Sequence, residues 1–123
     1  MKHVLVIDDS PVVRSFHMNI LKTGGFKTDG ACDGVEALEK ALSKKYDLIL
    51  CDINMPNMDG LTFIRKYREQ NEKTPIFILT TQEENIHKQK GYEAGANLYI
   101  VKPVKPKSLM LHINMILGES DKK

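Results

Sequence analysis

Four short stretches of the chain are continuously apolar, and a polar residue follows each of them directly. Continuous rather than alternating apolarity is typical of strands that are covered on both faces, as in a parallel sheet. The stretches are VLVI at 4–7, LILC at 48–51, IFIL at 76–79 and LYIV at 98–101. The segment KTDGA at 27–31 is a poor strand by composition. We nevertheless predict an edge strand there, because the alternation of strands and helices requires one.

Helix-length segments with apolar residues at helical spacing separate these strands. Ser10 is a good N-cap before Pro11 at the first helical position, and Pro106 suits the start of the last helix. The fourth helix is the weakest prediction, since Ile86 and Ala94 are its only clear apolar anchors. The predicted helices cover 11–23, 34–44, 60–70, 83–94 and 106–117. The anchors expected to face the core include Val13, Phe16, Ile20, Leu21, Val35, Leu38, Leu42, Leu61, Ile64, Tyr67, Leu109, Ile113, Ile116 and Leu117.

A strand followed by a helix, repeated five times, predicts an α/β fold with a five-stranded parallel sheet. Right-handed crossovers lead to a doubly wound (βα)5 sandwich of the flavodoxin-like type, with strand order 2-1-3-4-5. All carboxyl ends then lie along one edge of the sheet. The residues displayed there are Asp8 and Asp9, Asp52, Thr80 and Lys102. Strands 1 and 3 are neighbours in this order, so three carboxylates should converge.

Three converging carboxylates repel one another, and without a cation one or more of them would tend to protonate. An all-oxygen site suits a hard divalent ion such as Mg²⁺, with Mn²⁺ or Ca²⁺ as alternatives. Lys102 adds a positive charge and Thr80 a hydroxyl group. A cation, an ammonium and a hydroxyl around a carboxylate form a phosphoryl-transfer environment, in which an aspartate can be the nucleophile.

Length and composition agree with one ordinary domain and exclude several classes. We expect the 123 residues to form a single domain over 1–118, followed by a frayed tail at 119–123. A formal net charge of +2 gives no argument for nucleic acid, and no apolar run approaches the roughly 20 residues that span a membrane. Cys32 and Cys51 lack the spacing of a zinc site or a disulfide framework. These features favour a cytoplasmic protein.

Simpler explanations exist for the individual residues, and other functions for the fold. An acidic pair after a strand is often only a helix cap, and a single lysine is usually only solvated. A flavin carrier on this fold would need a phosphate-binding loop rich in Ser, Thr or Gly after the first strand, where this chain has DDSP. A phosphohydrolase that acts through aspartate would be expected to carry a second carboxylate at position 54, where this chain has Asn54.

The segments VLVIDDSPVVR, DINMPNMDGL, ILTT and YIVKP, in this order, resemble the receiver domains of two-component response regulators. The likeness covers nearly the whole chain and is greatest to stand-alone chemotaxis regulators of the CheY type. It implies a signalling domain rather than an enzyme, a histidine kinase as phosphodonor, and Mg²⁺ as cofactor. It also implies a switch that exposes a surface for a downstream protein or a second copy of the chain.

The resemblance assigns a role to each residue at the sheet edge. Asp52 corresponds to the phosphoacceptor and Lys102 to the partner of the phosphoryl oxygens, with a cis peptide bond to the proline that follows it. Asp9 corresponds to a direct Mg²⁺ ligand and Asp8 to a ligand through water. The roles that remain are a backbone carbonyl ligand at Asn54, a switch hydroxyl at Thr80 and an aromatic switch at Tyr99.

The output surface is expected on the face made by residues 83–94, strand 98–101 and helix 106–117. On the last helix, Leu111 and Met115 are four residues apart and should point away from the sheet. An outward apolar pair often marks a binding site, although single exposed apolar residues are common. The residues expected at this surface are Lys88, Tyr92, Tyr99, Leu111, His112 and Met115.

Overall fold

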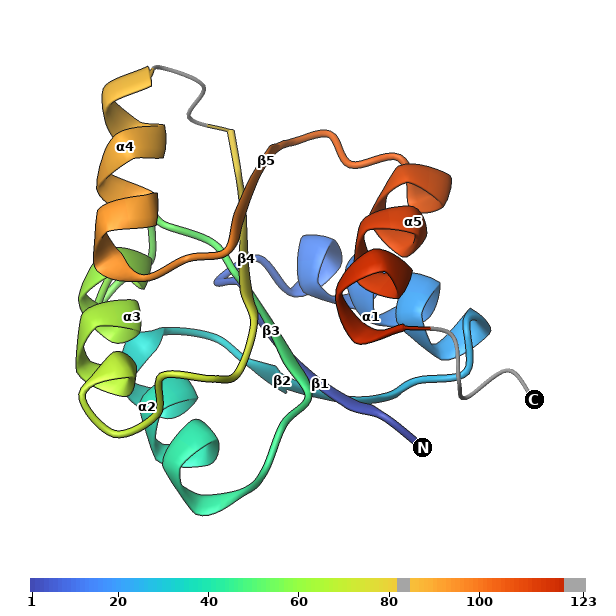
Figure 1. Ribbon diagram of the computed structural model, residues 1–123, viewed down its shortest axis with the longest axis horizontal. Coiled ribbons are helices and arrows are strands. Elements are labelled where there is room, and N and C mark those ends of the chain that lie inside the picture. The colour runs from blue at the N-terminus through green and yellow to red at the C-terminus, as the bar shows by residue number, and fades with distance from the viewer. Residues whose placement is uncertain (82–84, 119–123) are drawn as a thin grey trace.

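The computed structural model describes residues 1–81 and 85–118, and five parallel strands form its centre (Figure 1). The strands are β1 (His3–Ile7), β2 (Lys27–Ala31), β3 (Leu48–Cys51), β4 (Ile76–Thr80) and β5 (Leu98–Val101). The helices are α1 (Pro11–Thr23), α2 (Gly34–Ser43), α3 (Gly60–Arg68), α4 (Asn85–Ala94) and α5 (Pro106–Leu117). The strand order is β2-β1-β3-β4-β5, so the predicted topology is confirmed.

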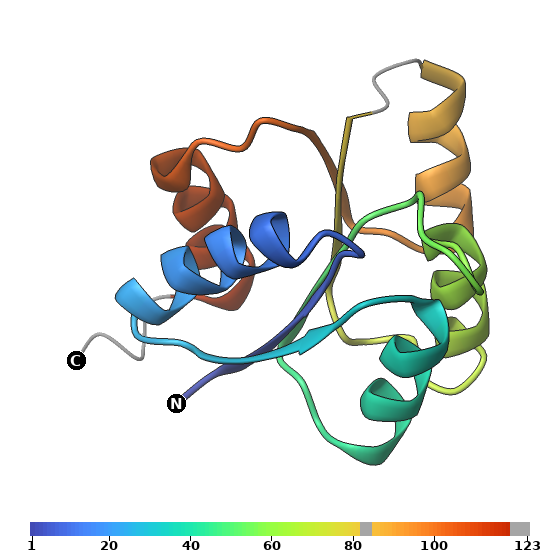
Figure 2. The same ribbon diagram turned by 180° about the vertical axis from the view of Figure 1, so that it is seen from behind.

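Alternate residues of each central strand pack against opposite helical layers. In β1, Leu5 faces the layer formed by α2, α3 and α4, whereas Val6 faces the layer formed by α1 and α5. The two layers lie on either side of the sheet in both views (Figures 1 and 2). All four residues of β3 and all five of β4 are buried, which explains why these strands carry no polar alternation.

The polar strand β2 forms because it pairs with β1 along its whole length, in register from His3 opposite Lys27 to Ile7 opposite Ala31. Its glycine lies in tight contact with α1. A Cβ on Gly30 would lie 3.1 Å from the Arg14 side chain and 3.2 Å from the sulfur of Met18. The unfavourable composition at this position therefore reflects close packing of α1 against an edge strand.

Residues at the helix N-termini explain where several helices begin. Ser10 accepts a hydrogen bond from the Val13 N–H, and Asp59 caps α3 by accepting from Thr62 N–H. Helix α5 starts at Pro106, after a residue that makes no side-chain cap. Helix α4 begins at Asn85, and the predicted residues 83 and 84 lie outside the described residues, as does the tail 119–123.

Four of the expected core anchors are wrong. The buried residues of α1 are His17 and Leu21, because the helix is rotated so that Phe16 lies at its edge. The other incorrect anchors are exposed on their helices because Ala37 and Ala41 in α2, and Leu109 and Ile113 in α5, are the buried residues there. The four incorrect anchors are Phe16, Val35, Leu42 and Ile116.

Candidate functional site

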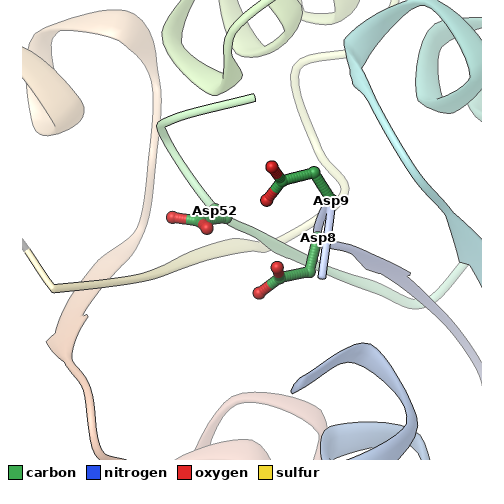
Figure 3. A group of neighbouring side chains, drawn as sticks. All are labelled: Asp8, Asp9 and Asp52. Carbon is green, nitrogen blue, oxygen red and sulfur yellow. The ribbon is translucent and has the colours of Figure 1, made fainter. Parts of the chain in front are cut away.

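Three aspartates converge at the carboxyl ends of β1 and β3 (Figure 3). Residue Ile7 pairs with Cys51, so the residues that follow these two strands are neighbours. One carboxylate oxygen from each of Asp8, Asp9 and Asp52 lies within 4.8 Å of the others. Asp8 is buried, Asp52 is half-buried and Asp9 is exposed. The convergence that the strand order predicted is therefore present.

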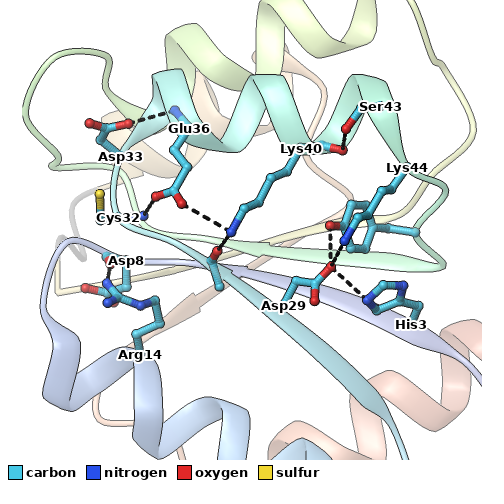
Figure 4. Close-up of polar contacts among 12 residues, drawn as sticks. His3, Asp8, Arg14, Asp29, Cys32, Asp33, Glu36, Lys40, Ser43 and Lys44 are labelled. Carbon is cyan, nitrogen blue, oxygen red and sulfur yellow. Dashed lines mark hydrogen bonds and ion pairs between the residues drawn. The ribbon is translucent and has the colours of Figure 1, made fainter.

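Backbone contacts fix the orientation of Asp8. Its N–H donates to the Ala31 carbonyl at 3.1 Å, and its Oδ1 accepts from the Ser10 N–H at 3.0 Å. The guanidinium of Arg14 donates to its backbone carbonyl at 2.6 Å (Figure 4). The second carboxylate oxygen, Oδ2, accepts instead from the ammonium of Lys102. The sequence analysis missed Arg14, although its position one turn after Pro11 places it beside the end of β1.

Lys102, which follows β5, brings a positive charge to the acidic cluster. Its ammonium donates to Oδ2 of Asp8 at 2.7 Å and to Oδ2 of Asp52 at 3.3 Å. Its backbone N–H donates to the carbonyl of Thr80 at 2.7 Å, and Thr80 is fully buried at the end of β4. The Lys102–Pro103 peptide bond is cis, as the resemblance implied. The lysine therefore neutralises part of the acidic cluster.

The ionised form of Asp52 is disfavoured in this environment. Burial is the main cause that raises the pKa of its carboxyl, and the negative charge of Asp8 acts in the same direction. The positive charge of Lys102 and the Ile53 N–H, which donates to Asp52 Oδ1 at 2.7 Å, oppose this shift without cancelling it. Additional positive charge beside Asp52 would therefore be favourable.

The donor set fits a hard divalent cation. The three carboxylates offer oxygen ligands on one side of the sheet edge, and their mutual repulsion is the cost that such an ion relieves. Asn54 is exposed and lies in the loop after β3, two residues beyond Asp52. The ligand roles of Asp8, Asp9, Asp52 and Asn54 remain predictions.

The loop after β3 passes close to Asp52. The Gly60 N–H donates to the Ile53 carbonyl at 2.8 Å. A Cβ at position 60 would collide with the backbone carbonyl oxygen of Asp52. Glycine is therefore required at this position to let α3 begin directly behind Asp52.

A buried histidine, which the sequence analysis did not assign, lies below the site. His17 is 2% exposed on α1. Burial lowers its pKa, the positive charge of Lys102 lowers it further, and Asp8 acts in the opposite direction. We therefore expect a neutral imidazole beside the charged groups. Its helical spacing from Leu21, also buried, was the available signal.

The expected switch and surface residues differ in their exposure. Tyr99 is buried, at 8% exposure, and burial followed by the charge of Asp52 raises the pKa of its hydroxyl. Its ring lies beside Gly91 of α4, where a Cβ would come within 3.1 Å of it. On α4, Tyr92 is exposed and Lys88 is half-buried.

The expected surface residues of α5 are exposed or half-buried. Met115 is 73% exposed and His112 is half-buried. Leu111 is exposed but lines a cavity of about 610 Å³ between α1 and α5, together with Phe16 and Ile20. The exposure of Leu111 and Met115 agrees with side chains that point away from the sheet, and their place in an output surface stays a prediction.

Comparison with known proteins agrees with this geometry. Residues 4–114 match the response regulator receiver domain family, and the chain belongs to that family. Among solved structures, the chemotaxis protein CheY4 of Vibrio cholerae is 38% identical with a TM-score of 0.90, covering 95% of this chain and 99% of that one. A CheY-like receiver domain protein of Methanospirillum hungatei is 28% identical with a TM-score of 0.92, covering 99% and 98%.

Longer proteins also contain a segment similar to this chain. The sensor protein EvgS of Escherichia coli (strain K12) is 40% identical over 113 residues, which are 92% of this chain and 9% of EvgS. The transcriptional regulatory protein ResD of Bacillus subtilis (strain 168) is 39% identical over 114 residues, 93% of this chain and 47% of ResD. The chain thus spans less than half the length of these relatives. Among the described residues, no helix has both the length and the apolar character needed to cross a bilayer.

Proposed function

We propose that this chain is a phosphorylation-driven switch in which Asp52 accepts a phosphoryl group from the phosphohistidine of a histidine kinase. The observation that carries the proposal is the position of Asp52. Its carboxylate lies beside two further acids and 3.3 Å from the ammonium of Lys102, at the strand ends of a receiver domain. Mg²⁺, or Mn²⁺ in its place, is the proposed cofactor, held by Asp8, Asp9, Asp52 and the carbonyl of Asn54.

The proposed transfer forms one bond and breaks one. An oxygen of the Asp52 carboxylate attacks phosphorus, and the bond from phosphorus to the histidine nitrogen breaks. The nitrogen keeps the electron pair, and the product on Asp52 is an acyl phosphate. When bound, the cation supplies positive charge for the phosphoryl oxygens. The ammonium of Lys102 is already held between Asp8 and Asp52, where it can pair with those oxygens after transfer.

The switch is proposed to run through the end of β4. Thr80 is buried at this end, and its carbonyl accepts from the Lys102 N–H at 2.7 Å, so its hydroxyl is the proposed partner of the new phosphoryl group. Tyr99 is close enough for the charge of Asp52 to affect its pKa. Rearrangement of these two residues would shift the population toward a binding-competent surface formed by α4, β5 and α5. We propose a downstream protein or a second copy of the chain as its partner.

A stand-alone chemotaxis-type regulator is the proposed context. The coverage of 99% of Vibrio cholerae CheY4 supports it. The alternative is a receiver domain that works within a longer regulatory protein, and the similarity to ResD favours that one. The domain limits of 1–118 and the cytoplasmic location stay part of the proposal.

The test is to incubate the protein with acetyl phosphate and Mg²⁺, and to measure intact mass and amide NMR spectra. Wild type should gain one phosphoryl group, whereas Asp52→Asn should gain none. Asp47→Asn is the matched control, because Asp47 accepts from the His3 N–H at the opposite edge of the sheet and should be labelled normally. The NMR shifts should include Tyr99 and α4. Equal labelling of wild type and Asp52→Asn would refute the assignment.

A further inference from the structure

The loop between β3 and α3, residues 53–59, joins the phosphoacceptor to the helix behind it and carries the proposed ligand Asn54. One of its residues, Asn57, has a left-handed backbone with φ of 67°. Residues other than glycine adopt this conformation at a cost, and asparagine tolerates it better than most. Within the loop, the Met58 N–H donates to the Pro56 carbonyl at 2.7 Å across Asn57, and a contact from outside the loop adds to this local support.

That contact comes from the start of α2. The side-chain amide of Asn57 donates to Oδ2 of Asp33 at 2.7 Å. Asp33 is 8% exposed, and its other oxygen, Oδ1, accepts from the Glu36 N–H at 2.8 Å and so caps α2 (Figure 4). The two carboxylate oxygens therefore have separate partners, since Oδ1 holds the helix and Oδ2 holds the loop. Both hydrogen bonds lower the pKa of Asp33, and the bond from the Glu36 N–H has the larger effect.

A second contact holds the same loop to the same helix end. The Gly34 N–H donates to the Met58 carbonyl at 3.0 Å. A Cβ on Gly34 would lie 2.5 Å from that carbonyl oxygen and 2.7 Å from the Met58 Cβ, so the two segments touch without room for a side chain. On the other side, the loop closes through the bond from Gly60 N–H to the Ile53 carbonyl at 2.8 Å.

We propose that Asp33 and Asn57 form a positioning pair, which holds the β3–α3 loop so that the Asn54 carbonyl is presented to the cation at the Asp52 site. This inference rests on the proposed function. The pair touches neither the cation nor the phosphoryl group and acts through the loop backbone. Partners that orient metal ligands typically contribute about 10- to 100-fold to metal affinity.

Because the two oxygens of Asp33 have separate partners, the pair can be broken without removing the helix cap. In Asp33→Asn, the remaining oxygen can still cap α2, because asparagine is as good a cap as aspartate. Its amide then faces the amide of Asn57, donor against donor. In Asn57→Asp, two carboxylates face each other, and aspartate also tolerates the left-handed backbone. The double variant restores one hydrogen bond in the reverse direction and keeps the net charge of wild type.

The experiment measures the Mg²⁺ dissociation constant by calorimetry and the hydrogen exchange of loop amides in the four proteins of this cycle. Asp33→Asn should weaken Mg²⁺ binding about tenfold and speed exchange of the Gly34 amide, with unfolding close to that of wild type. The double variant should return to within about threefold of wild-type affinity. Asp59→Asn is the control, since it removes a carboxylate at the end of the same loop and can still cap α3.

If Asp33→Asn and Asp59→Asn lose Mg²⁺ affinity by the same small factor, only the lost charge matters. This result would overturn the positioning role. A double variant that stays as weak as Asp33→Asn would do the same. If wild type binds Mg²⁺ and Asp33→Asn binds it with the same affinity, this inference alone is overturned. A wild-type chain that binds no Mg²⁺ overturns the proposed cofactor, and the inference with it.

Discussion

Replacing Lys102 with methionine should raise the pKa of Asp52 in the metal-free protein. The change keeps most of the side-chain volume and removes the positive charge that lies 3.3 Å from Asp52 and 2.7 Å from Asp8. Two unit charges 3.3 Å apart attract by about 5 kcal/mol at an effective dielectric constant of 20, and by about 1.3 kcal/mol in bulk water. The side chains of Lys102 and Asp52 are 14% and 12% exposed, so the interaction lies between these limits.

One pKa unit corresponds to about 1.4 kcal/mol. Even the lower limit therefore predicts a further rise in the pKa of Asp52, in addition to the rise that burial already causes. This higher pKa also changes how the stability of the fold depends on pH. A carboxyl whose folded-state pKa lies above its unfolded value binds its proton more tightly when folded, so stability falls as pH rises toward the folded pKa. This loss should be larger in Lys102→Met and should extend to higher pH.

The assay is a ¹³C NMR titration of the aspartate carboxyl groups without metal, together with thermal unfolding with and without Mg²⁺. Because wild type already has the lysine charge, Mg²⁺ should raise the melting temperature of Lys102→Met more than that of wild type. Lys105→Met, an exposed lysine on the same connection, is the control and should leave both measurements unchanged. An Asp52 pKa that is the same in Lys102→Met and wild type would refute the reasoning, because removing a charge this close must change the pKa.

Two further predictions concern the supports of the site. Gly60→Ala should destabilise the fold by about 3 kcal/mol in urea unfolding, because the new Cβ collides with the carbonyl of Asp52; a loss under about 1 kcal/mol would contradict this. The pKa of Glu36 is lowered to about 2, chiefly because it accepts from the Cys32 N–H at 2.8 Å. Its contribution, about 1 kcal/mol after solvent screening, should be present above pH 4.5 and disappear as pH falls toward 2. Glu36→Gln should lose this part of the acid dependence, and an unchanged acid transition would speak against it.

The architecture could be predicted because backbone physics leaves few alternatives. Apolar runs such as 48–51 and 76–79 are buried on both faces, and right-handed crossovers then determine which strands are neighbours. Once β1 and β3 are adjacent, Asp8 and Asp52 must meet. No side-chain detail is needed for this step, which explains why it succeeded for the acidic cluster.

Predictions that depended on helix rotation were less successful. Phe16 and His17 are adjacent on α1. Phenylalanine is the more apolar of the two, so hydrophobicity alone favours Phe16 as the buried residue. The structure buries His17 instead, because α1 is rotated so that His17 and Leu21 are its buried residues. On α5, Ile116 was expected in the core but is exposed, and Leu109 and Ile113 are the buried residues. A helical period determines which residues share a face, but the tertiary packing decides where that face points.

Contacts between distant loops could not be predicted at all. Asp33 and Asn57 are 24 residues apart, and each has a sufficient local explanation as a helix cap or a turn residue. Their hydrogen bond exists only because α2 and the β3–α3 loop are adjacent at the same sheet edge. A contact of this kind becomes visible only when the fold is known, so the cycle at positions 33 and 57 tests an interaction that the sequence motifs do not show.

The charges at the sheet edge indicate an order for the proposed events. When all three carboxylates are ionised, they and the ammonium of Lys102 carry a net charge of about minus two, and one divalent cation would cancel it. An incoming phosphoryl group carries further negative charge, so without the cation it would meet an acidic cluster that Lys102 only partly neutralises. With the cation bound, the carboxylates no longer depend on the lysine, and its ammonium becomes available to the phosphoryl oxygens. Cation binding should therefore precede phosphoryl transfer.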